Sequence, residues 1–185
     1  MSGGANTPVE NLPGTPPAGE HGALSCGKEL SFPPAAEAKF QKLLTRYPTK
    51  QAALLPTLWI AQGEWGWISR EAVDYVASRL ELSSAFVWGV VTFYTMYNRA
   101  PVGKHLIQVC TSISCHLNGA EEVFHECRKK LGGLRPGETS ADGKFTVVEV
   151  ECLAQCDKAP AVMVNGDDHE RITLDKLDAF LAELK

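Results

Sequence analysis

Four of the six cysteines in this chain fall into two close pairs whose spacing suits metal binding. Cys110 and Cys115 form a C-x4-C pair, and Cys152 and Cys156 form a C-x3-C pair. Four thiolates hold a 2Fe-2S cluster, a 4Fe-4S cluster or a zinc ion. The C-x2-C-x2-C-x3-C run of bacterial 4Fe-4S ferredoxins is absent, whereas two distant pairs suit a two-iron cluster in which each pair holds one iron. The spacing therefore favours a 2Fe-2S cluster, with zinc binding and thiol or disulfide chemistry as the alternatives.

Two predicted strands are expected to bring these pairs together. Residues 104–110 and 145–151 have the period of strands, and residues 118–131 between them have the period of a helix. A strand-helix-strand crossover makes the strands parallel, so that both carboxyl ends lie at the same edge of the sheet. Cys110 ends the first strand and Cys152 follows the second. We therefore expect all four thiols of the two pairs to converge at one edge.

The remainder of the C-terminal half predicts a hairpin and a final helix. Residues 161–164 and 169–172 flank an Asn-Gly-Asp-Asp turn, which is typical of a β-hairpin. Thr173 then caps a helix with leucines on one side. The expected element order is β-α-β-β-β-α, and the expected fold class of the whole chain is α+β.

Helical periodicity predicts a small bundle ahead of the first strand. The third helix of this bundle is capped by Ser69 and reaches Leu80. The other three helices are expected at residues 35–46, 51–62 and 85–97, and Gly63 is expected to end the second of them. Residues 85–97 are apolar nearly all round, so we expect this helix to be the buried member of the bundle.

Composition and period divide the chain into three regions. Residues 1–34 hold six of the eleven prolines and six of the sixteen glycines, without apolar periodicity. Such a segment buries too little surface to offset its ordering entropy, so we expect a disordered or extended tail. Residues 35–100 form the predicted helical bundle, and residues 101–185 form the predicted cysteine-bearing domain.

Charge and hydropathy exclude several function classes. The net charge is −4 and the basic residues are dispersed, so no basic stripe for nucleic acid is present. The longest uncharged stretch, residues 82–98, has 17 residues, fewer than the ~20 apolar residues that span a bilayer. The first 30 residues carry neither a secretory signal nor an Arg-rich presequence. We expect a cytoplasmic protein, whose cysteines serve metal or redox chemistry rather than disulfides.

The other candidate residues have structural interpretations. Cys127 lies on the apolar face of the predicted helix, and we expect a buried, inert thiol. Cys26 is expected to be an oxidisable thiol of the tail. His116 follows a ligand candidate directly, but four cysteines already suffice, so we do not expect it to bind metal. Most of the aromatic residues between positions 59 and 97 are expected in the core, with one or two left for a partner surface. No NAD site is predicted.

Three segments resemble the 24 kDa subunit family of respiratory complex I, which includes the equivalent subunit of bacterial NADH:quinone oxidoreductases. They are PTLWIAQGEWGWIS at residues 56–69, VWGVVTFYTMYNRAPVGKHLIQVCTSISC at residues 87–115 and VVEVECLAQCDKAPAVMVNG at residues 147–166. The resemblance covers about residues 35–185. The family pattern C-x4-C-x3-G followed by E-C-L-x-x-C-x3-P is matched by Cys110, Cys115, Gly119, Glu151, Cys152, Leu153, Cys156 and Pro160.

The resemblance implies a thioredoxin-like 2Fe-2S ferredoxin domain preceded by a helical docking domain. It implies one 2Fe-2S cluster on Cys110, Cys115, Cys152 and Cys156, with FMN and NADH on a flavin-bearing partner subunit in a heterodimer. The cluster of such a protein exchanges single electrons with that FMN. The chain would then be an electron carrier without a substrate site or catalytic residue of its own, in the peripheral arm of a complex at the cytoplasmic face of the inner membrane.

Two departures and three alternatives accompany the resemblance. Ala154 stands where the family usually has Gly, at a position whose backbone angle favours glycine. The tail is longer than the family pattern. The alternatives are the equivalent small subunit of a soluble NAD-reducing hydrogenase or formate dehydrogenase, a zinc-stabilised interaction module, and a thioredoxin-like thiol oxidoreductase.

Overall fold

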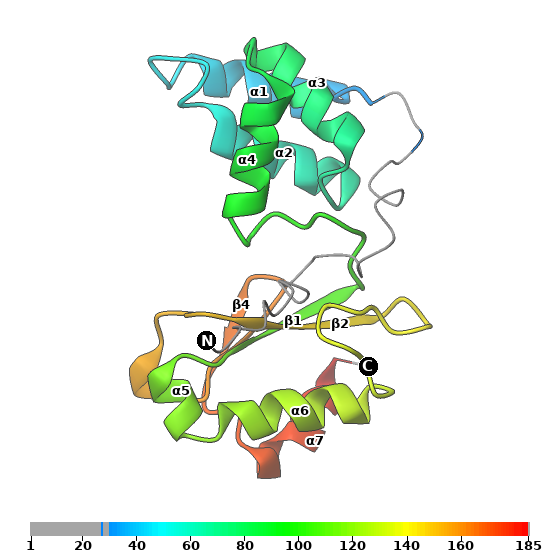
Figure 1. Cartoon of the computed structure of the whole chain (residues 1–185), viewed down its shortest axis with the longest axis vertical. Coiled ribbons are helices and arrows are strands. Elements are labelled where there is room, and N and C mark those ends of the chain that lie inside the picture. The colour runs from blue at the N-terminus through cyan, green and yellow to red at the C-terminus, as the bar shows by residue number, and fades with distance from the viewer. Residues whose placement is uncertain (1–26, 28–29, 185) are drawn as a thin grey trace, which may run out of the picture. The chain divides into compact units, whose positions relative to one another are not determined.

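The computed structural model describes residue 27 and residues 30–184 of the chain. It contains two compact units, the first ending at Pro101 and the second beginning at Val102. The first unit is helical, and the second is built on a sheet (Figure 1). Cys26 and most of the expected tail lie outside the described residues.

The described residues of the helical unit form four helices: α1 (Pro34–Leu44), α2 (Leu54–Trp65), α3 (Arg70–Leu80) and α4 (Ser84–Phe93). Local capping defines the last two. Ser69 and Ser83 accept backbone N–H groups of Ala72 and Phe86 through their side chains, which satisfies donors that a helix start leaves free. The predicted cap at Ser69 is thus confirmed, and Leu80 lies within the helix as expected.

Several predicted boundaries in this unit are wrong, including the start of the second helix, which is Leu54 rather than residue 51. Gly63 does not end α2, because the helix continues to Trp65 and ends at Gly66, which has the left-handed conformation with φ 81°. The fourth helix does not reach Tyr97, because Tyr94 adopts an extended conformation and ends α4 at Phe93. A glycine inside an apolar period is tolerated at a cost of about 1 kcal/mol, so its presence alone does not set a helix end.

The expectation that the fourth helix is buried all round is also wrong. Val87 and Val91 face the core, whereas Phe86 and Phe93 are 43% and 76% exposed. The core of this unit is instead formed mainly by α2 and α3, with Phe40 of α1. The expected tail also ends earlier than residue 34, because Phe32 is buried and stacks on Trp65 with ring centroids 5.4 Å apart.

The second unit is a four-stranded mixed sheet in the order β2-β1-β3-β4. The strands are β1 (His105–Cys110), β2 (Phe145–Val150), β3 (Val162–Val164) and β4 (Asp167–His169). β1 pairs in parallel with β2 and antiparallel with β3. A hairpin is present as predicted, but the prediction places its second strand too late, at residues 169–172. The turn consists only of Asn165 and Gly166, both at positive φ as a two-residue turn requires, so β4 already begins at Asp167.

Three helices accompany the sheet: α5 (Ile113–Leu117), α6 (Ala120–Lys130) and α7 (Leu174–Glu183). α6 and α7 contact each other and lie along one side of the sheet (Figure 1). The predicted helix start at Asn118 is wrong, because Gly119 is in the left-handed region and separates a short helix, α5, from α6. The core lies between these helices and the strands, around Ile107, Val147 and Leu177.

Among the described residues, no helix is both long enough and apolar enough to cross a bilayer.

Candidate metal centre

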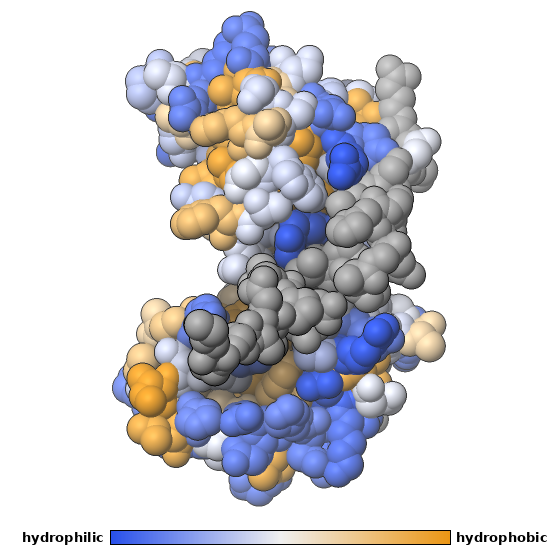
Figure 2. All heavy atoms as spheres, in the orientation of Figure 1, coloured by the Kyte–Doolittle hydropathy of each residue, from blue (hydrophilic) through white to orange (hydrophobic). Residues whose placement is uncertain are grey.

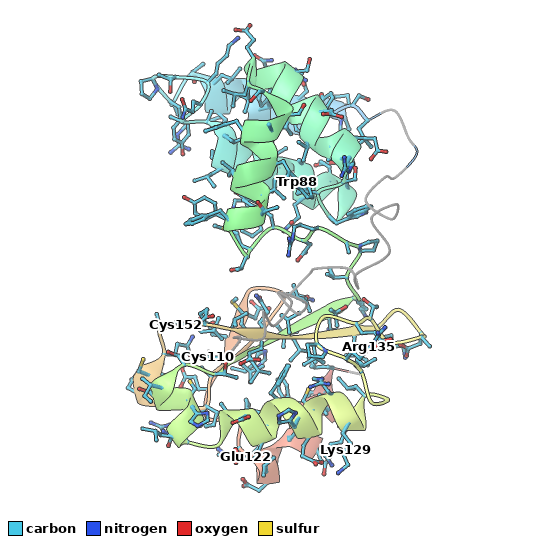
Figure 3. The ribbon with its side chains drawn as sticks, viewed as in Figure 1. Trp88, Cys110, Glu122, Lys129, Arg135 and Cys152 are labelled. Carbon is cyan, nitrogen blue, oxygen red and sulfur yellow. The ribbon has the colours of Figure 1, made fainter. Side chains whose placement is uncertain are left out.

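The parallel pairing of β1 with β2 places the two cysteine loops side by side. Cys110 is the last residue of β1, and its partner across the ladder is Val150, the last residue of β2. Cys152 follows Val150 by two residues. Figure 3 shows Cys110 and Cys152 at the same end of the sheet. The crossover argument therefore holds, and the strands that carry the two loops are direct neighbours.

The first cysteine pair is buried. Cys110 and Cys115 are 3% and 2% exposed and pack with Ala161. The backbone N–H of Cys110 donates to the carbonyl of Ala161 at 3.1 Å, which fixes the end of β1. Cys115 lies on the buried side of the five-residue helix α5. Residues two positions before and after it face the opposite side of the helix.

The second cysteine pair is exposed and lies on a turn. Cys152 and Cys156 are exposed thiols on either side of Ala154. Ala154 has φ 58°, and its N–H donates to Cys152 Sγ at 3.3 Å. The short 3-10 helix Cys156–Lys158 follows, held by the Lys158 N–H, which donates to the carbonyl of Gln155 at 3.0 Å. This turn carries both exposed thiols beyond the end of β2.

Hydrogen bonds join the two loops. The N–H of Thr111 donates to the carbonyl of Val150 at 3.1 Å, and Cys110 Sγ lies 3.9 Å from the carbonyl oxygen of Glu151. The Thr111 hydroxyl donates to a carboxylate oxygen of Glu149 at 2.6 Å. That hydroxyl is therefore directed at β2, rather than available to a sulfur of its own loop.

The surroundings of Cys115 alter the pKa of its thiol. Burial raises the pKa of the Cys115 thiol, and the neighbouring thiols of Cys110 and Cys156 raise it further. Cys115 is therefore influenced by one thiol from each loop. Cys152 directly follows Glu151, whose carbonyl oxygen is the one that Cys110 Sγ contacts.

Within the described part of the chain, no three or more His, Cys, Asp or Glu side chains are grouped closely enough to hold a single metal ion. A structural zinc ion requires four ligands around one point. A 2Fe-2S cluster requires only two thiolates at each iron, so its ligands are divided into pairs. Two cysteine pairs on neighbouring loops suit the paired ligands of a 2Fe-2S cluster.

The chemistry of the donors fits a 2Fe-2S cluster. The loops supply four thiols from two adjacent segments, and a backbone N–H already points at one of the sulfurs. N–H groups that donate to sulfur are a common means of tuning such clusters. The Oε1 atom of Gln155, in the same loop, is buried without a hydrogen-bond partner.

The aromatic residues between positions 59 and 97, most of which are expected in the core from the sequence, are mostly not buried: Tyr97 is 2% exposed, but Trp59 and Phe93 are 50% and 76% exposed.

Cys127 and His116 have different surroundings. Cys127 is buried in the core on α6, and burial raises its pKa to about 12, so the prediction of a buried thiol is confirmed. His116 is directed at Glu121, with Nδ1 at 3.5 Å from a carboxylate oxygen. Sequence reasoning missed Glu149 and Gln155, because neither belongs to a spacing motif.

Exposed apolar side chains lie beside the first cysteine pair. Ile113 and Leu117, one turn apart on α5, are 71% and 76% exposed, and they flank the buried Cys115. Figure 2 shows hydrophobic surface in the region of α5. Glu151 and Asp157, in the second loop, are also exposed. The edge of the sheet that carries the cysteines thus combines apolar and acidic groups.

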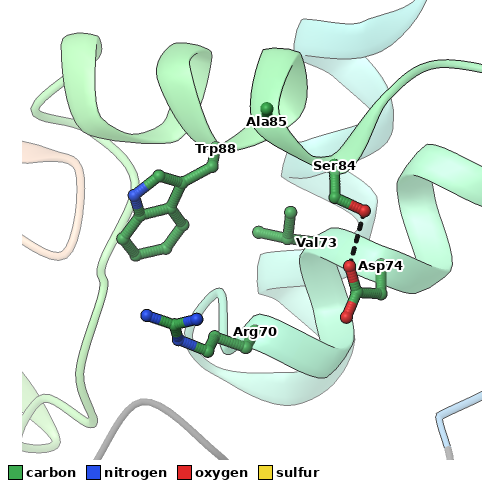
Figure 4. A pocket seen from close by; sticks show the side chains of 6 residues that line it. All are labelled: Arg70, Val73, Asp74, Ser84, Ala85 and Trp88. Carbon is green, nitrogen blue, oxygen red and sulfur yellow. Dashed lines mark hydrogen bonds between the residues drawn. The ribbon is translucent and has the colours of Figure 1, made fainter. Parts of the chain in front are cut away.

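A pocket of about 220 Å³ lies in the helical unit between α3 and α4 (Figure 4). Arg70 and Trp88 line one side of it, and Ser84 donates a hydrogen bond to Asp74 at 2.6 Å on the other. The volume is below the ~300 Å³ at which small-molecule sites begin, and no cysteine lines the pocket. The residues that line it are therefore different from the candidate metal ligands.

The chain is similar to one family model and to several known proteins. Residues 40–185 match the family model described as thioredoxin-like [2Fe-2S] ferredoxin. The chain is 40% identical over 148 residues to an NADH-quinone oxidoreductase subunit from Rickettsia bellii, covering 78% of this chain and 88% of that protein. It is 41% identical to the mitochondrial NADH dehydrogenase [ubiquinone] flavoprotein 2 of Dictyostelium discoideum, covering 80% of this chain and 60% of that protein.

A solved structure shares the fold. An NAD+-reducing [NiFe]-hydrogenase chain superposes with a TM-score of 0.61 at 21% identity, over 71% of this chain. Our chain spans only 22% of that hydrogenase chain. The predicted fold class, mixed α and β with a thioredoxin-like ferredoxin unit, is confirmed by the family match and by the sheet described above.

Proposed function

Because the chain belongs to the thioredoxin-like [2Fe-2S] ferredoxin family, we propose that it is the electron-carrying subunit of an NADH:quinone oxidoreductase. It carries one 2Fe-2S cluster. It exchanges single electrons with the FMN of a flavin-bearing, NADH-oxidising partner subunit. It forms a heterodimer with that partner in the peripheral arm of the complex, at the cytoplasmic face of the inner membrane.

The observation that carries this proposal is the adjacency of β1 and β2. The register sets Cys110 opposite Val150, so the C-x4-C loop and the C-x3-C loop leave the sheet at the same edge. Cys110 and Cys115 would hold the inner iron, because both thiols are buried. Cys152 and Cys156 would hold the outer iron, because both are exposed.

The protein residues supply ligands, orientation and a charge environment. The bound cluster supplies one-electron redox chemistry. The Ala154 N–H donates to Cys152 Sγ, which holds this sulfur in place and stabilises negative charge on it. The hydrogen bonds between Thr111 and β2 fix the first loop against the second.

A partner must approach the cluster closely to exchange electrons with it, and the exposed second pair is the accessible side. Ile113 and Leu117 provide apolar contact area beside the first pair, and Glu151 and Asp157 provide acidic groups in the loop of the second pair. We expect the flavin-bearing partner to bind here with an apolar surface edged by basic residues. The helical unit, residues 35–100, would supply further docking surface through Phe86 and Phe93.

The test of this function is an EPR spectrum of the dithionite-reduced protein, prepared anaerobically, together with iron and acid-labile sulfide counts. We expect two irons and two sulfides per chain and the signal of a reduced 2Fe-2S cluster. One zinc ion per chain without visible absorbance would instead establish the zinc-stabilised module. A colourless protein with a reactive thiol pair would establish the thiol oxidoreductase.

A second candidate is the equivalent small subunit of a soluble NAD-reducing hydrogenase or formate dehydrogenase. The structural similarity to an NAD+-reducing [NiFe]-hydrogenase chain favours it, although at 21% identity this likeness concerns the fold alone. Affinity purification of the native complex separates the two. Membrane-bound partners with quinone reductase activity support the leading function, and a nickel-containing or formate-oxidising complex supports the second.

A further inference from the structure

The loop between the two exposed cysteines contains a polar group that its surroundings leave unsatisfied. Gln155 Oε1 is buried and has no hydrogen-bond partner, and among the described residues it is the sole buried side-chain nitrogen or oxygen in that state. Buried polar atoms in native proteins are nearly always hydrogen-bonded. A carbonyl oxygen confined in this way therefore requires an explanation.

The position of Gln155 connects it with the metal centre. It directly precedes Cys156 and follows Cys152 by three residues. Its backbone is fixed, since its carbonyl accepts the Lys158 N–H at 3.0 Å at the start of the 3-10 helix. The same loop turns back on a ligand sulfur, as the Ala154 N–H contact with Cys152 Sγ demonstrates.

The oxygen and the nitrogen of a glutamine carboxamide have nearly the same shape. Rotation by half a turn exchanges Oε1, which only accepts hydrogen bonds, for Nε2, which donates two. The thiolate and sulfide sulfurs of a 2Fe-2S cluster are acceptors and carry negative charge. Gln155 is half-buried, and its Oε1 end is enclosed. Toward an acceptor sulfur, an enclosed carboxamide end is satisfied by its nitrogen and left unsatisfied by its oxygen.

We infer that the Gln155 carboxamide donates a hydrogen bond from Nε2 to a sulfur of the 2Fe-2S cluster, and that it thereby raises the reduction potential of this cluster. The inference rests on the proposed function, because it requires the cluster between the two loops. Donation to sulfur stabilises the reduced form, which carries one more negative charge, and so favours reduction. Gln155 adds a side-chain donor to the backbone donor of Ala154.

The test compares the loaded full-length protein with its Gln155→Leu variant, which has similar volume and no donor. At equilibrium with a redox dye of fixed potential, we expect the ratio of reduced to oxidised cluster to fall about tenfold in the variant. For a one-electron couple this is a potential lower by about 59 mV. Gln108→Leu, on β1, is the matched control and should leave the ratio unchanged.

A spectroscopic readout separates donation from a packing effect. Electron-nuclear double resonance of the reduced protein in H2O and D2O should show an exchangeable proton coupled to the cluster that is missing in Gln155→Leu. If that variant does not retain the cluster, Gln155→Glu gives the same test, because an ionised carboxylate of equal shape has no donor. In either variant the proton must disappear.

In the apoprotein, Gln155→Leu should be favourable rather than unfavourable. Without the cluster the buried oxygen has no hydrogen-bond partner, which lowers the stability of the folded protein. Gln155→Leu should therefore raise the urea midpoint of the apoprotein. An unchanged dye ratio with an unchanged proton spectrum in the loaded protein would overturn the inference while leaving the proposed function intact. Absence of iron and sulfide from the wild-type protein would overturn both.

Discussion

At the scale of single residues, the four cysteines of the proposed metal centre differ in their environment. Cys110 and Cys115 are buried, whereas Cys152 and Cys156 are exposed, although all four belong to one sheet edge. Cys127, a fifth thiol, is buried on α6 with a pKa raised to about 12 by its burial. These environments lead to different expectations for substitution.

Replacing any one of the four paired cysteines by serine should reduce the iron content and the EPR signal to near zero. A hydroxyl is a poor ligand for iron compared with a thiolate. Cys127→Ser should retain the cluster, and it should lower the free energy of unfolding by about 1 kcal/mol because it buries a hydroxyl in an apolar core. Iron analysis and urea denaturation measure the two effects. Cluster loss in Cys127→Ser would contradict the ligand assignment.

Ala154 stores backbone strain beside Cys152. Its φ of 58° costs an L-residue about 1 to 2 kcal/mol, and glycine avoids most of this cost while adding about 0.5 to 1 kcal/mol of unfolded-state entropy. Ala154→Gly should therefore raise the free energy of unfolding by about 0.5 to 1 kcal/mol. Ala38→Gly, at an exposed position inside α1, should lower it by about 1 kcal/mol. Chemical denaturation should show a higher free energy of unfolding for Ala154→Gly and a lower one for Ala38→Gly.

At the scale of elements, an ion pair fastens α1 to α3. The Arg79 guanidinium donates two hydrogen bonds to the Glu37 carboxylate, at 2.6 and 2.8 Å, and one to the Tyr75 hydroxyl at 2.6 Å. It also lies 4.5 Å from the centre of the Phe40 ring. A two-pronged contact of this kind positions two helices more firmly than a single surface ion pair does.

This ion pair should make stability depend on acid pH. Hydrogen bonds from Arg79 and Gln41 lower the pKa of Glu37 from its usual 4.5 to about 2. A lowered carboxyl pKa adds stability that is complete above about pH 4.5 and is lost as the pH falls toward 2. The side chains are 34% and 27% exposed, so we expect only about 1 kcal/mol after solvent screening. Glu37→Gln should lower stability by this amount at pH 7 and flatten the acid dependence in denaturant titrations.

The short helix α5 should contribute to partner binding. Ile113 and Leu117 are exposed beside Cys115, and burying either side chain in an interface contributes about 1.5 kcal/mol. Ile113→Ser or Leu117→Ser should weaken binding of the flavin-bearing partner about tenfold each, without changing the EPR signal. Leu174→Ser, at a half-exposed site on α7, is the control. Equal affinities for all three variants in calorimetry would rule out α5 as the contact.

At the scale of the whole molecule, the chain consists of two units with separate hydrophobic cores. The cysteine loops, the sheet and the helices α5 to α7 all belong to the second unit. Gly103 at its start is closely packed, since a Cβ there would lie 2.7 Å from the backbone nitrogen of Phe145. The metal centre thus has all of its supporting elements within one part of the sequence.

A fragment of residues 101–185 should therefore fold and hold the cluster without the helical unit. We expect the reduced fragment to give the same EPR signal as the full chain, because every proposed ligand and every hydrogen bond to the loops is retained. Its affinity for the flavin-bearing partner should fall, since Phe86 and Phe93 are removed. A fragment that loses the cluster would indicate that the helical unit supports the metal centre directly.

The sequence by itself determined the spacing of the two cysteine pairs, the parallel crossover and most helices of this protein. Spacing and periodicity are local properties of the chain. Tertiary structure decided the rest. Tyr94 ends α4 and two phenylalanines of that helix remain exposed, although their sequence is as apolar as a core helix. The isolated oxygen of Gln155 and the hydrogen bond of Thr111 to β2 have no sequence signal either. Burial and hydrogen bonding of a side chain depend on segments distant in the sequence, and only packing brings those segments into contact.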